Sequence, residues 1–515
     1  MDLTEYGNFS SQTPQEKVRI RSNMTSLWLI LTGMMVPLGF APFHFPGAAI
    51  LGIALFYYHI RNSRPKKAFF QGFVWGLGLF GLGISWVSVS IHTYGHLPNL
   101  YAYLITGLFV FYLAMFPALC AFAFRLLCPT SDYKKALLFS GLWCISEYLR
   151  ANVMTGFPWL LLGFGQIDTP LKYLLPIIGV YGIGFLIVLA ACCLTHIIKT
   201  PERSTLVRIT WLAGFVLILI TPASLKNITW SQSDKSPLSV GVVQANLSMR
   251  DKWNEQLFWK IIKHYHRAIE PLLAKKDIIV LPEAAIPLPT GYVQDLLTEL
   301  HQQAQKNKSA ILFGIPEEIY PEKTHFYNTL STLGLAEGRY RKQHLVPFGE
   351  YLPHFLEPVL RQLNLVMSDM QAGDAQQPLA SAQNHPFATL ICYELAYPSI
   401  LRRQLPQAQW IVSLSDDGWF GHSLASYQQL QMAQALSILT SRYQIVANND
   451  GLSSIITPQG QLQKTLPAFS SGILEGNIYP AQGTTPWVIW GDVPILGLCG
   501  LMVMLALGGR MRAFR

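Results

Sequence analysis

The sequence predicts a protein of two parts, a bundle of about eight membrane-spanning α-helices and an α/β domain inserted before the last span. Two observations predict this division. Apolar residues make up 51% of the 515-residue chain and charged residues only 13%, against about a quarter in soluble proteins. The apolar residues form long runs near both ends, whereas residues 239–457 alternate short apolar runs with amphipathic stretches. This composition excludes an ordinary soluble enzyme and an intrinsically disordered chain.

Eight apolar runs are candidate spans, because a helix needs about 20 mostly apolar residues to cross the hydrocarbon core of a bilayer. The second and fifth runs are short. A polar leader precedes the first run and no clear small-residue cleavage site follows it, which favours an uncleaved anchor over a signal peptide. The runs are residues 26–42, 46–60, 69–90, 100–124, 135–150, 173–197, 206–222 and 487–508. The expected domains are a leader at 1–24, a seven-span membrane domain at 25–222, an extramembrane domain at 223–486, and a last span with a basic tail at 487–515.

Basic side chains predict the orientation of the bundle, because cytoplasmic loops carry an excess of Lys and Arg. Residues 231–485 contain 19 basic and 21 acidic side chains, which leaves 19 basic and 8 acidic residues for the hydrophobic part. With a cytoplasmic N-terminus and an even number of spans, 16 of those 19 basic residues lie on cytoplasmic segments. Both termini are then cytoplasmic, and residues 223–486 are periplasmic. The net charge of +9 therefore indicates membrane orientation, and no nucleic-acid partner is expected.

The extramembrane domain is expected to be a layered α/β domain, because candidate strands and helices alternate along it. Its expected strands are residues 239–244, 277–281, 310–314, 326–333, 387–393, 410–415, 443–447 and 453–457. Its expected helices are residues 252–274, 291–306, 397–404 and 424–440. The motifs HExxH, paired CxxC and the P-loop are absent, so neither a metal nor another cofactor is expected.

Three short segments of this domain contain reactive side chains. Cys392 follows an apolar strand and is the one cysteine of the domain, since the other six lie in or beside the spans. Glu283 stands in Leu-Pro-Glu-Ala-Ala, and Lys342 precedes Gln-His-Leu-Val-Pro-Phe-Gly-Glu-Tyr. Taken singly, these residues are more typical of core packing, a helix cap and a solvated turn. Their order along the chain, a Glu, then a Lys, then a Cys, changes that interpretation.

The three segments resemble the carbon–nitrogen hydrolase (nitrilase) superfamily, whose catalytic residues are Glu, Lys and Cys in this order. The spans, the run from His344 to Tyr351 and the segment Cys-Tyr-Glu make nearly the whole chain similar to the bacterial apolipoprotein N-acyltransferases. The resemblance implies a nitrilase-like αββα sandwich. It implies that Glu283, Lys342 and Cys392 are catalytic and that Glu350, Tyr393 and Glu394 support them. It further implies substrate-binding roles for Trp253, Asn328, Trp419 and Phe420.

The activity that this resemblance implies is transfer of an acyl chain from a phospholipid, of phosphatidylethanolamine type, through a thioester on the cysteine. The acceptor would be the α-amino group of a diacylglyceryl-apolipoprotein, and the enzyme would lie in the bacterial inner membrane. Two alternatives remain at this point. One is a membrane-tethered amidase that passes the acyl group to water, and the other is a transporter or scaffold without catalysis.

Some positions depart from the family pattern. Asp416 stands where Asn is usual, the helix at 431–435 lacks expected arginines, and Asn449-Asp450-Gly451 replaces Asn-Asn-Gly. None of these departures is expected to touch the catalytic set. Residues 351–370 are unusually apolar for a connection, which suggests a flap that enters the outer leaflet and guides acyl chains. In that case, Asp at both Leu363 and Val366 would impair acylation and leave the fold intact.

Overall fold

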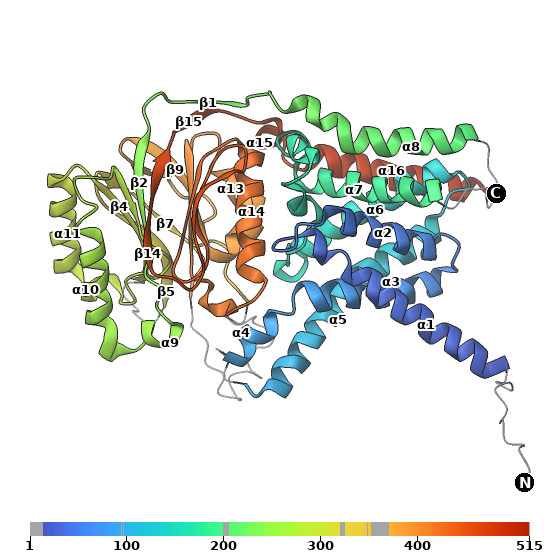
Figure 1. Ribbon diagram of the computed structural model, residues 1–515, viewed down its shortest axis with the longest axis horizontal. Coiled ribbons are helices and arrows are strands. Elements are labelled where there is room, and N and C mark those ends of the chain that lie inside the picture. Colours follow the sequence, from blue (N-terminus) through green and yellow to red (C-terminus); the bar gives the residue numbers. More distant parts are fainter. Residues whose placement is uncertain are drawn as a thin grey trace, which may run out of the picture.

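A computed structural model describes residues 14–93, 95, 97–198, 205–319, 325–347, 349–351 and 370–513. A helical bundle and a sandwich of two β-sheets lie end to end, and helices cover both outer faces of the sandwich (Figure 1). The expected αββα sandwich is therefore confirmed. The apolar segment 351–370 lies almost entirely outside the described residues, so a flap there stays a prediction.

Each apolar run of the sequence corresponds to a helix or a pair of helices. The third run is broken into two helices that are bent by 57°. The first helix begins at Pro14, earlier than the expected end of the leader. The helices are α1 (Pro14–Met34), α2 (Pro46–Ile60), α3 (Pro65–Gly83), α4 (Val87–Thr93), α5 (Asn99–Leu127), α6 (Asp132–Asn152), α7 (Leu175–Ile198), α8 (Thr205–Ile220), α15 (Pro486–Trp490) and α16 (Val493–Ala513).

The expected number of eight spans is not confirmed. Four helical segments of the described chain are long and apolar enough to cross a membrane, or five if the bent pair α3–α4 counts as one span. The apolar parts of α1 and α2 are shorter than a span requires. Helix α6 is long enough but carries five charged side chains, which are Asp132, Lys134, Lys135, Glu147 and Arg150. The four segments are Asn99–Leu127, Pro170–Ile198, Thr205–Leu225 and Val493–Arg510.

The connections α2–α3 and α5–α6 meet at the end of the bundle farthest from the sandwich. The guanidinium of Arg125 donates hydrogen bonds to the main-chain carbonyls of Arg61 and Ser63, which holds the two connections together. Helix α1 begins and helix α16 ends at this same end (Figure 1). Several of the basic residues that predict a cytoplasmic face are therefore gathered on one side of the bundle.

The two sheets have parallel strands at their centres. In the first sheet β2, β3 and β4 are parallel, and in the second β9, β10 and β11 are parallel. The first sheet has the order β14 (Gly472–Ile478), β2 (Leu238–Gln244), β3 (Ile278–Val280), β4 (Ala310–Glu318), β5 (Phe326–Gly334), β7 (Arg339–Arg341). The second has the order β13 (Leu462–Leu466), β12 (Ser453–Ile456), β11 (Gln444–Asn448), β10 (Trp410–Ser415), β9 (His385–Ile391), β8 (Ala380–Ala382), β6 (Ala336–Glu337). A separate pair joins β1 (Ser231–Ser233) to β15 (Ala481–Gly483).

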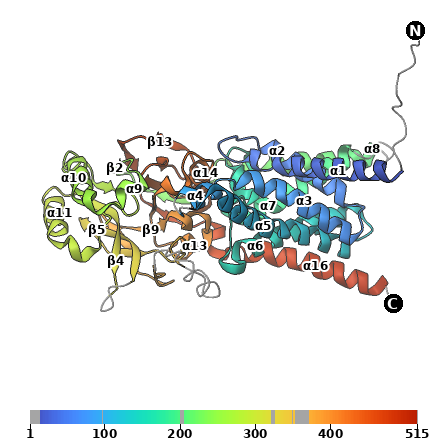
Figure 2. The ribbon, with the colours of Figure 1, turned by 90° about the horizontal axis from the view of Figure 1, so that it is seen from below.

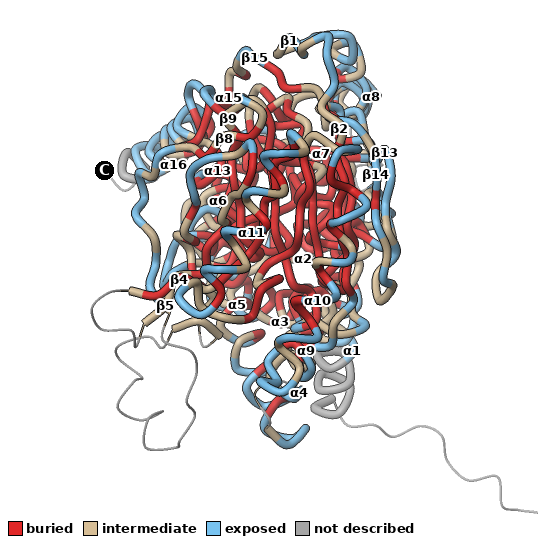
Figure 3. Tube along the Cα trace, turned by 90° about the vertical axis from the view of Figure 1, so that its left-hand side faces the viewer, coloured by how far each residue is buried: buried red, intermediate tan, exposed pale blue. Residues whose placement is uncertain are grey.

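Each sheet buries its inner face against the other sheet and its outer face against helices. Helices α10 (Phe258–Ile269) and α11 (Gln294–Lys306) cover the first sheet at the end farthest from the bundle (Figures 1 and 2). Helices α13 (Pro398–Arg403) and α14 (Ala425–Thr440) cover the second sheet on the side of the bundle. The strands between these layers are mostly buried (Figure 3). The expected helix 252–274 is in fact divided into α9 (Met249–Lys252), a short 3-10 turn and α10.

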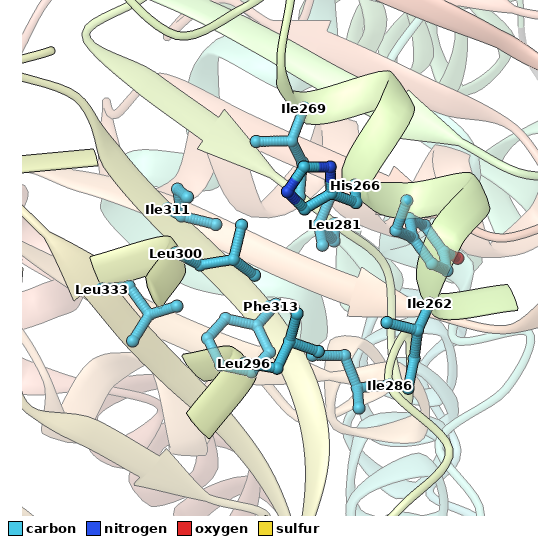
Figure 4. Close-up of a pocket in the computed structure, with 11 residues that line it drawn as sticks. Ile262, His266, Ile269, Leu281, Ile286, Leu296, Leu300, Ile311, Phe313 and Leu333 are labelled. Atoms are coloured by element: carbon cyan, nitrogen blue, oxygen red, sulfur yellow. The ribbon is translucent and has the colours of Figure 1, made fainter. Parts of the chain in front are cut away.

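A small cavity lies between α10, α11 and the first sheet (Figure 4). Its lining is almost entirely aliphatic and aromatic, and its volume is about 20 Å³. That volume accommodates about one water molecule and no acyl chain. The cavity is therefore a packing defect of the core, and the reactive side chains lie elsewhere.

Candidate active site

The three residues expected to be catalytic each follow a strand of the sandwich. Glu283 follows β3 and Lys342 follows β7, both in the first sheet, while Cys392 follows β9 in the second sheet. All three side chains are buried. Groups at the carboxyl ends of parallel strands converge at one edge of a sheet, which is where α/β proteins bind ligands.

Glu283 is held by donors from two segments, strand β5 and the turn that follows β10. Its Oε1 accepts a hydrogen bond from Asn328 Nδ2 at 2.7 Å, and its Oε2 accepts one from the main-chain N–H of Asp416 at 3.0 Å. Lys342 Nζ lies 3.6 Å from Oε1. Burial raises the pKa of Glu283 above its ordinary range, and the ammonium of Lys342 opposes that rise. A carboxylate with a raised pKa is a stronger base than an ordinary one, so it is suited to accept and return a proton.

The main chain at Glu283 passes unusually close to β4. A Cβ atom at Gly314 would lie 2.7 Å from both Glu283 Cα and Pro282 O, and it would also collide with the main-chain nitrogen of Ala284. The two segments are joined by a hydrogen bond from Gly314 N–H to Pro282 O at 3.1 Å. A glycine at 314 therefore sets the height of the Glu283 side chain above the sheet.

Lys342 is paired with two carboxylates. Its Nζ donates to Glu350 Oε1 at 2.7 Å, and Asn328 Nδ2 reaches the same oxygen at 3.1 Å. Burial acts to lower the pKa of Lys342, but the negative charges of Glu350 and Glu283 outweigh it and raise this pKa above its ordinary value. Lys342 is therefore a permanent cation beside the thiol. Asn328, expected to contact substrate, instead donates to both carboxylates.

Cys392 occupies a strained position at the end of β9. The strand ends at Ile391, two residues earlier than the sequence indicates, and a 3-10 helix begins at Cys392 itself. The φ of Cys392 is +52°, a conformation that non-glycine residues rarely adopt and that is found at functional sites. Burial, and then the charge of Glu283, raise the pKa of the Cys392 thiol well above its ordinary value, while Lys342 lowers it. The side chain of Cys392 is therefore a thiol close to a carboxylate and an ammonium.

Glu394 joins the segment after Cys392 to the segment after Lys342. One of its carboxylate oxygens accepts from the N–H groups of Gln343 at 2.7 Å and His344 at 3.1 Å, and the other accepts from Ile391 N–H at 2.8 Å. The hydroxyl of Tyr340 donates to both oxygens. Burial raises the pKa of Glu394 to about 7, and the main-chain donors oppose the rise. Glu394 therefore fixes the relative positions of the thiol and the ammonium.

Tyr393 connects the segment that contains Cys392 to the membrane bundle. Its hydroxyl donates to the carbonyl of Gly156 at 3.2 Å, and its ring is stacked 6.5 Å from the rings of Phe157 and Trp159. Arg150 holds that loop by donating to the carbonyls of Phe157 at 2.7 Å and Trp159 at 2.6 Å. A loop of the bundle thus forms one wall beside Cys392.

The remaining expected substrate-binding residues lie at the margin of this group. Phe420 packs against Trp86 of the bundle with ring centroids 4.8 Å apart, and Trp419 accepts a hydrogen bond at its carbonyl from Ser90 at 2.6 Å. The side chains of Trp419 and Trp253 are exposed. Exposed aromatic side chains beside a buried site are available to a ligand, so their roles stay predictions.

The expectation that Asp416 does not touch the catalytic set is wrong. Its main chain donates to Glu283, and its carboxylate forms a buried ion pair with Lys252, which the sequence analysis missed. Lys252 also donates to the main-chain carbonyl of Glu283 at 2.7 Å. A buried Asp in place of Asn requires a cation nearby, so the Asp at position 416 could have predicted a buried basic partner such as Lys252.

A metal site is not evident in this part of the chain. Among the residues that the structure describes, no group of three or more His, Cys, Asp or Glu side chains is arranged to hold a metal ion. The reactive groups gathered around Cys392 are its thiol, the carboxylates of Glu283 and Glu350, and the ammonium of Lys342, which together suit acyl transfer through a cysteine.

Comparison with known proteins places both parts of the chain. Residues 32–193 match the model of the apolipoprotein N-acyltransferase N-terminal domain, and residues 239–485 match the carbon-nitrogen hydrolase model. Among solved structures, a carbon-nitrogen hydrolase from Helicobacter pylori G27 aligns with 47% of this chain and 89% of its own, at 15% identity and a TM-score of 0.37.

Curated relatives extend over nearly the whole length. The chain is 35% identical over 487 residues to an apolipoprotein N-acyltransferase of Coxiella burnetii, covering 94% of this chain and 99% of that protein. It is 36% identical over 499 residues to the enzyme of that name from Pseudomonas aeruginosa, covering 94% and 96%. It is 34% identical over 496 residues to the one from Methylococcus capsulatus, covering 95% and 97%. On this similarity, the chain belongs to the apolipoprotein N-acyltransferase family and is an acyltransferase enzyme.

Proposed function

We propose that the protein transfers an acyl chain from a phospholipid, of phosphatidylethanolamine type, to the α-amino group of the N-terminal S-diacylglyceryl-cysteine of apolipoproteins. Cys392 is the acyl carrier, Glu283 the general base and acid, and Lys342 the cation that stabilises the oxyanion. The observation that carries this proposal is the buried group itself, in which Glu283 and Lys342 lie 3.6 Å apart and both act on the pKa of the Cys392 thiol.

In the first half-reaction the thiol attacks the ester carbonyl of the phospholipid. Glu283 takes the thiol proton as the C–S bond forms, because a thiol with a raised pKa is a poor nucleophile until a base removes its proton. Lys342, kept charged by Glu350 and Glu283, stabilises the oxyanion of the tetrahedral intermediate. The C–O bond then breaks, and Glu283 returns the proton to the departing lysophospholipid alkoxide.

In the second half-reaction the neutral α-amino group of the acceptor attacks the thioester. The C–N bond forms, the amine proton passes to Glu283, and the C–S bond breaks. Glu283 then returns the proton to the sulfur of Cys392, which restores the free thiol. Two half-reactions at one cysteine make the mechanism ping-pong.

The arrangement of the two parts supports a periplasmic site and cytoplasmic termini. Tyr393, next to Cys392, contacts the loop after α6 at one end of the bundle. The first residue of α1, the last residue of α16 and the basic connection held by Arg125 lie at the other end (Figure 1). A lipid in the outer leaflet of the inner membrane therefore approaches the site from the side of the bundle.

The intact mass of the purified protein tests the proposal most directly. After incubation with phosphatidylethanolamine vesicles, we expect a mass gain of one acyl chain that hydroxylamine removes, since hydroxylamine cleaves thioesters. The variant Cys392→Ala should show no gain, and Cys499→Ala, which changes a cysteine buried in α16, should behave as the wild type.

Addition of an acceptor separates acyl transfer from hydrolysis. A lipopeptide that begins with S-diacylglyceryl-cysteine should discharge the thioester and gain the acyl chain as an amide. Release of free fatty acid in place of the amide product would indicate an amidase-like hydrolase. Absence of any adduct on folded protein, with more than one headgroup offered, would refute the role of Cys392.

A further inference from the structure

The ion pair between Lys252 and Asp416 lies directly behind the proposed general base. Both side chains are almost completely buried, at 1% and 3% exposure, and they come from segments that follow strands of different sheets. Lys252 ends α9, which follows β2 of the first sheet, while Asp416 follows β10 of the second sheet. A buried ion pair is not a reliable source of stability, because desolvation of the two charges offsets their attraction. Its position therefore invites a functional explanation.

The pair holds Glu283 at two points. Lys252 Nζ donates to the main-chain carbonyl of Glu283 at 2.7 Å, and the main-chain N–H of Asp416 donates to Glu283 Oε2 at 3.0 Å. The other carboxylate oxygen of Asp416 accepts from Asn449 Nδ2 at 3.2 Å and from Gly418 N–H at 3.3 Å. Lys252 and Asp416 thus connect the main chain of Glu283 to its side chain through one buried bridge.

The pair also controls the charge around Glu283. The charged and titratable groups that act on Glu283 are Lys342 and Glu350 from the segment after β7, the Cys392 thiol after β9, and Asp416 after β10. The negative charge of Asp416 raises the pKa of Glu283, in the same direction as burial and Glu350. Lys252 is in contact with Asp416, so its ammonium cancels that charge. Without Lys252, the charge of Asp416 would be uncompensated, and of the charged groups just named Lys342 alone would lower the pKa of Glu283.

We propose that the Lys252–Asp416 pair is a positioning device for Glu283, in which Lys252 fixes the main chain of the base and neutralises the aspartate whose N–H orients its carboxylate. This inference rests on the proposed function, in which Glu283 takes the thiol proton. It makes Lys252 and Asp416 positioning residues, since neither is placed against substrate.

Alkylation of Cys392 measures the state of the base without requiring acyl transfer. The full-length protein in lipid nanodiscs is treated with iodoacetamide from pH 5 to pH 9, and modification of the Cys392 peptide is followed by mass spectrometry. We expect Lys252→Met to move the acid limb of this rate profile to higher pH by about one unit, which makes alkylation about tenfold slower at pH 6. The double variant K252M/D416N, which removes both charges, should return the limb to its wild-type position.

A merely structural pair would behave differently. It would make the double variant as impaired as Lys252→Met or more so, with no displacement of the limb, and that result would overturn the proposal. If Lys252→Met does not fold, Asp416→Asn provides the test, because an unopposed Lys252 should move the limb to lower pH and an unmoved limb refutes the idea. The exposed Lys260→Met is the matched control and should coincide with the wild type.

The same samples are offered phosphatidylethanolamine vesicles, and thioester formation is measured in parallel. Displacement and rescue of the alkylation profile without any thioester would refute the proposed function and leave the role of the pair standing. Thioester formation by the wild type, together with an alkylation profile that is unmoved in all three variants, would support the proposed function and refute the role of the pair.

Discussion

The close passage of Glu283 over β4 predicts that Gly314→Ala impairs catalysis more than it impairs stability. The new Cβ would lie 2.7 Å from Glu283 Cα, whereas ordinary contacts begin at 3.4 Å, so the main chain of Glu283 must move by about 0.7 Å. Extra atoms in a packed core cost about 1–3 kcal/mol of stability. A misplacement of about 1 Å at a reacting group costs about 100-fold in rate, so we expect thioester formation to slow on the order of 10- to 100-fold.

The rate of thioester formation by intact mass and the melting temperature by differential scanning fluorimetry give the two readouts. Gly472→Ala is the matched control, because its Cβ would meet the nearest atom at an ordinary 3.4 Å and Gly472 also lies in a strand of the first sheet. The control should retain the wild-type rate. A folded Gly314→Ala protein with an unchanged rate of thioester formation would refute the argument that this glycine sets the position of the base.

Three further changes test other parts of the site. Lys342→Met should slow iodoacetamide labelling of Cys392 at pH 7.5 at least about tenfold, because the ammonium lowers the pKa of both Cys392 and Glu283. Labelling at the wild-type rate would contradict this role of Lys342. Arg150→Gln should lower the melting temperature and slow acylation, because the carbonyls of Phe157 and Trp159 each lose their hydrogen-bond donor, at a cost of about 1–3 kcal/mol per carbonyl. Arg150→Lys should retain part of the stability and part of the acylation rate. An unchanged melting temperature and acylation rate in Arg150→Gln would contradict the role of the loop at residues 157–159. Burial and the neighbouring Asp416 and Asp417 raise the pKa of Asp450 to about 8, so its ionisation destabilises the fold increasingly as pH rises from about 4 to 8. Asp450→Asn should therefore raise the melting temperature more at pH 9 than at pH 5. A rise in melting temperature that is the same at both pH values would refute the raised pKa of Asp450.

Periodicity predicted the inner strands because they are apolar on both faces. The strands β2, β3 and β10 lie between sheet and helices, so they appear in the sequence as short continuous apolar runs. Strands β13 and β14 were missed, because their residues alternate or are largely exposed and include Lys464, Glu475 and Asn477. Strand β14 pairs with β2 across more than 200 residues of chain, and such a pairing depends on tertiary packing that no local pattern encodes.

The order of Glu283, Lys342 and Cys392 could be recognised in the sequence, but their partners could not. Lys252 stands in a polar segment beside Trp253 and resembles a solvated lysine, yet it is among the most deeply buried side chains of the chain. Asn328 fits a family motif, but its amide is used to join two carboxylates. Contacts of this kind join segments that are distant in sequence. They depend on how the two sheets pack against each other, which no local sequence pattern encodes.

The union of the sandwich with the bundle explains how a nitrilase-like site can act on lipids. One apolar cluster extends without interruption from the bundle to the outer face of the second sheet and includes Tyr393, Tyr397 and Leu401. Polar contacts reinforce it, since Gln428 accepts from Trp159 Nε1 at 2.6 Å and Gln431 accepts from the N–H of Ala41 at 3.0 Å. Separated from the bundle, the second sheet would expose this cluster, and Tyr393 would lose the stacked rings that fix it beside Cys392. The bundle therefore forms part of the wall of the proposed active site, because the same contacts that attach the domain also orient the segment that carries Cys392.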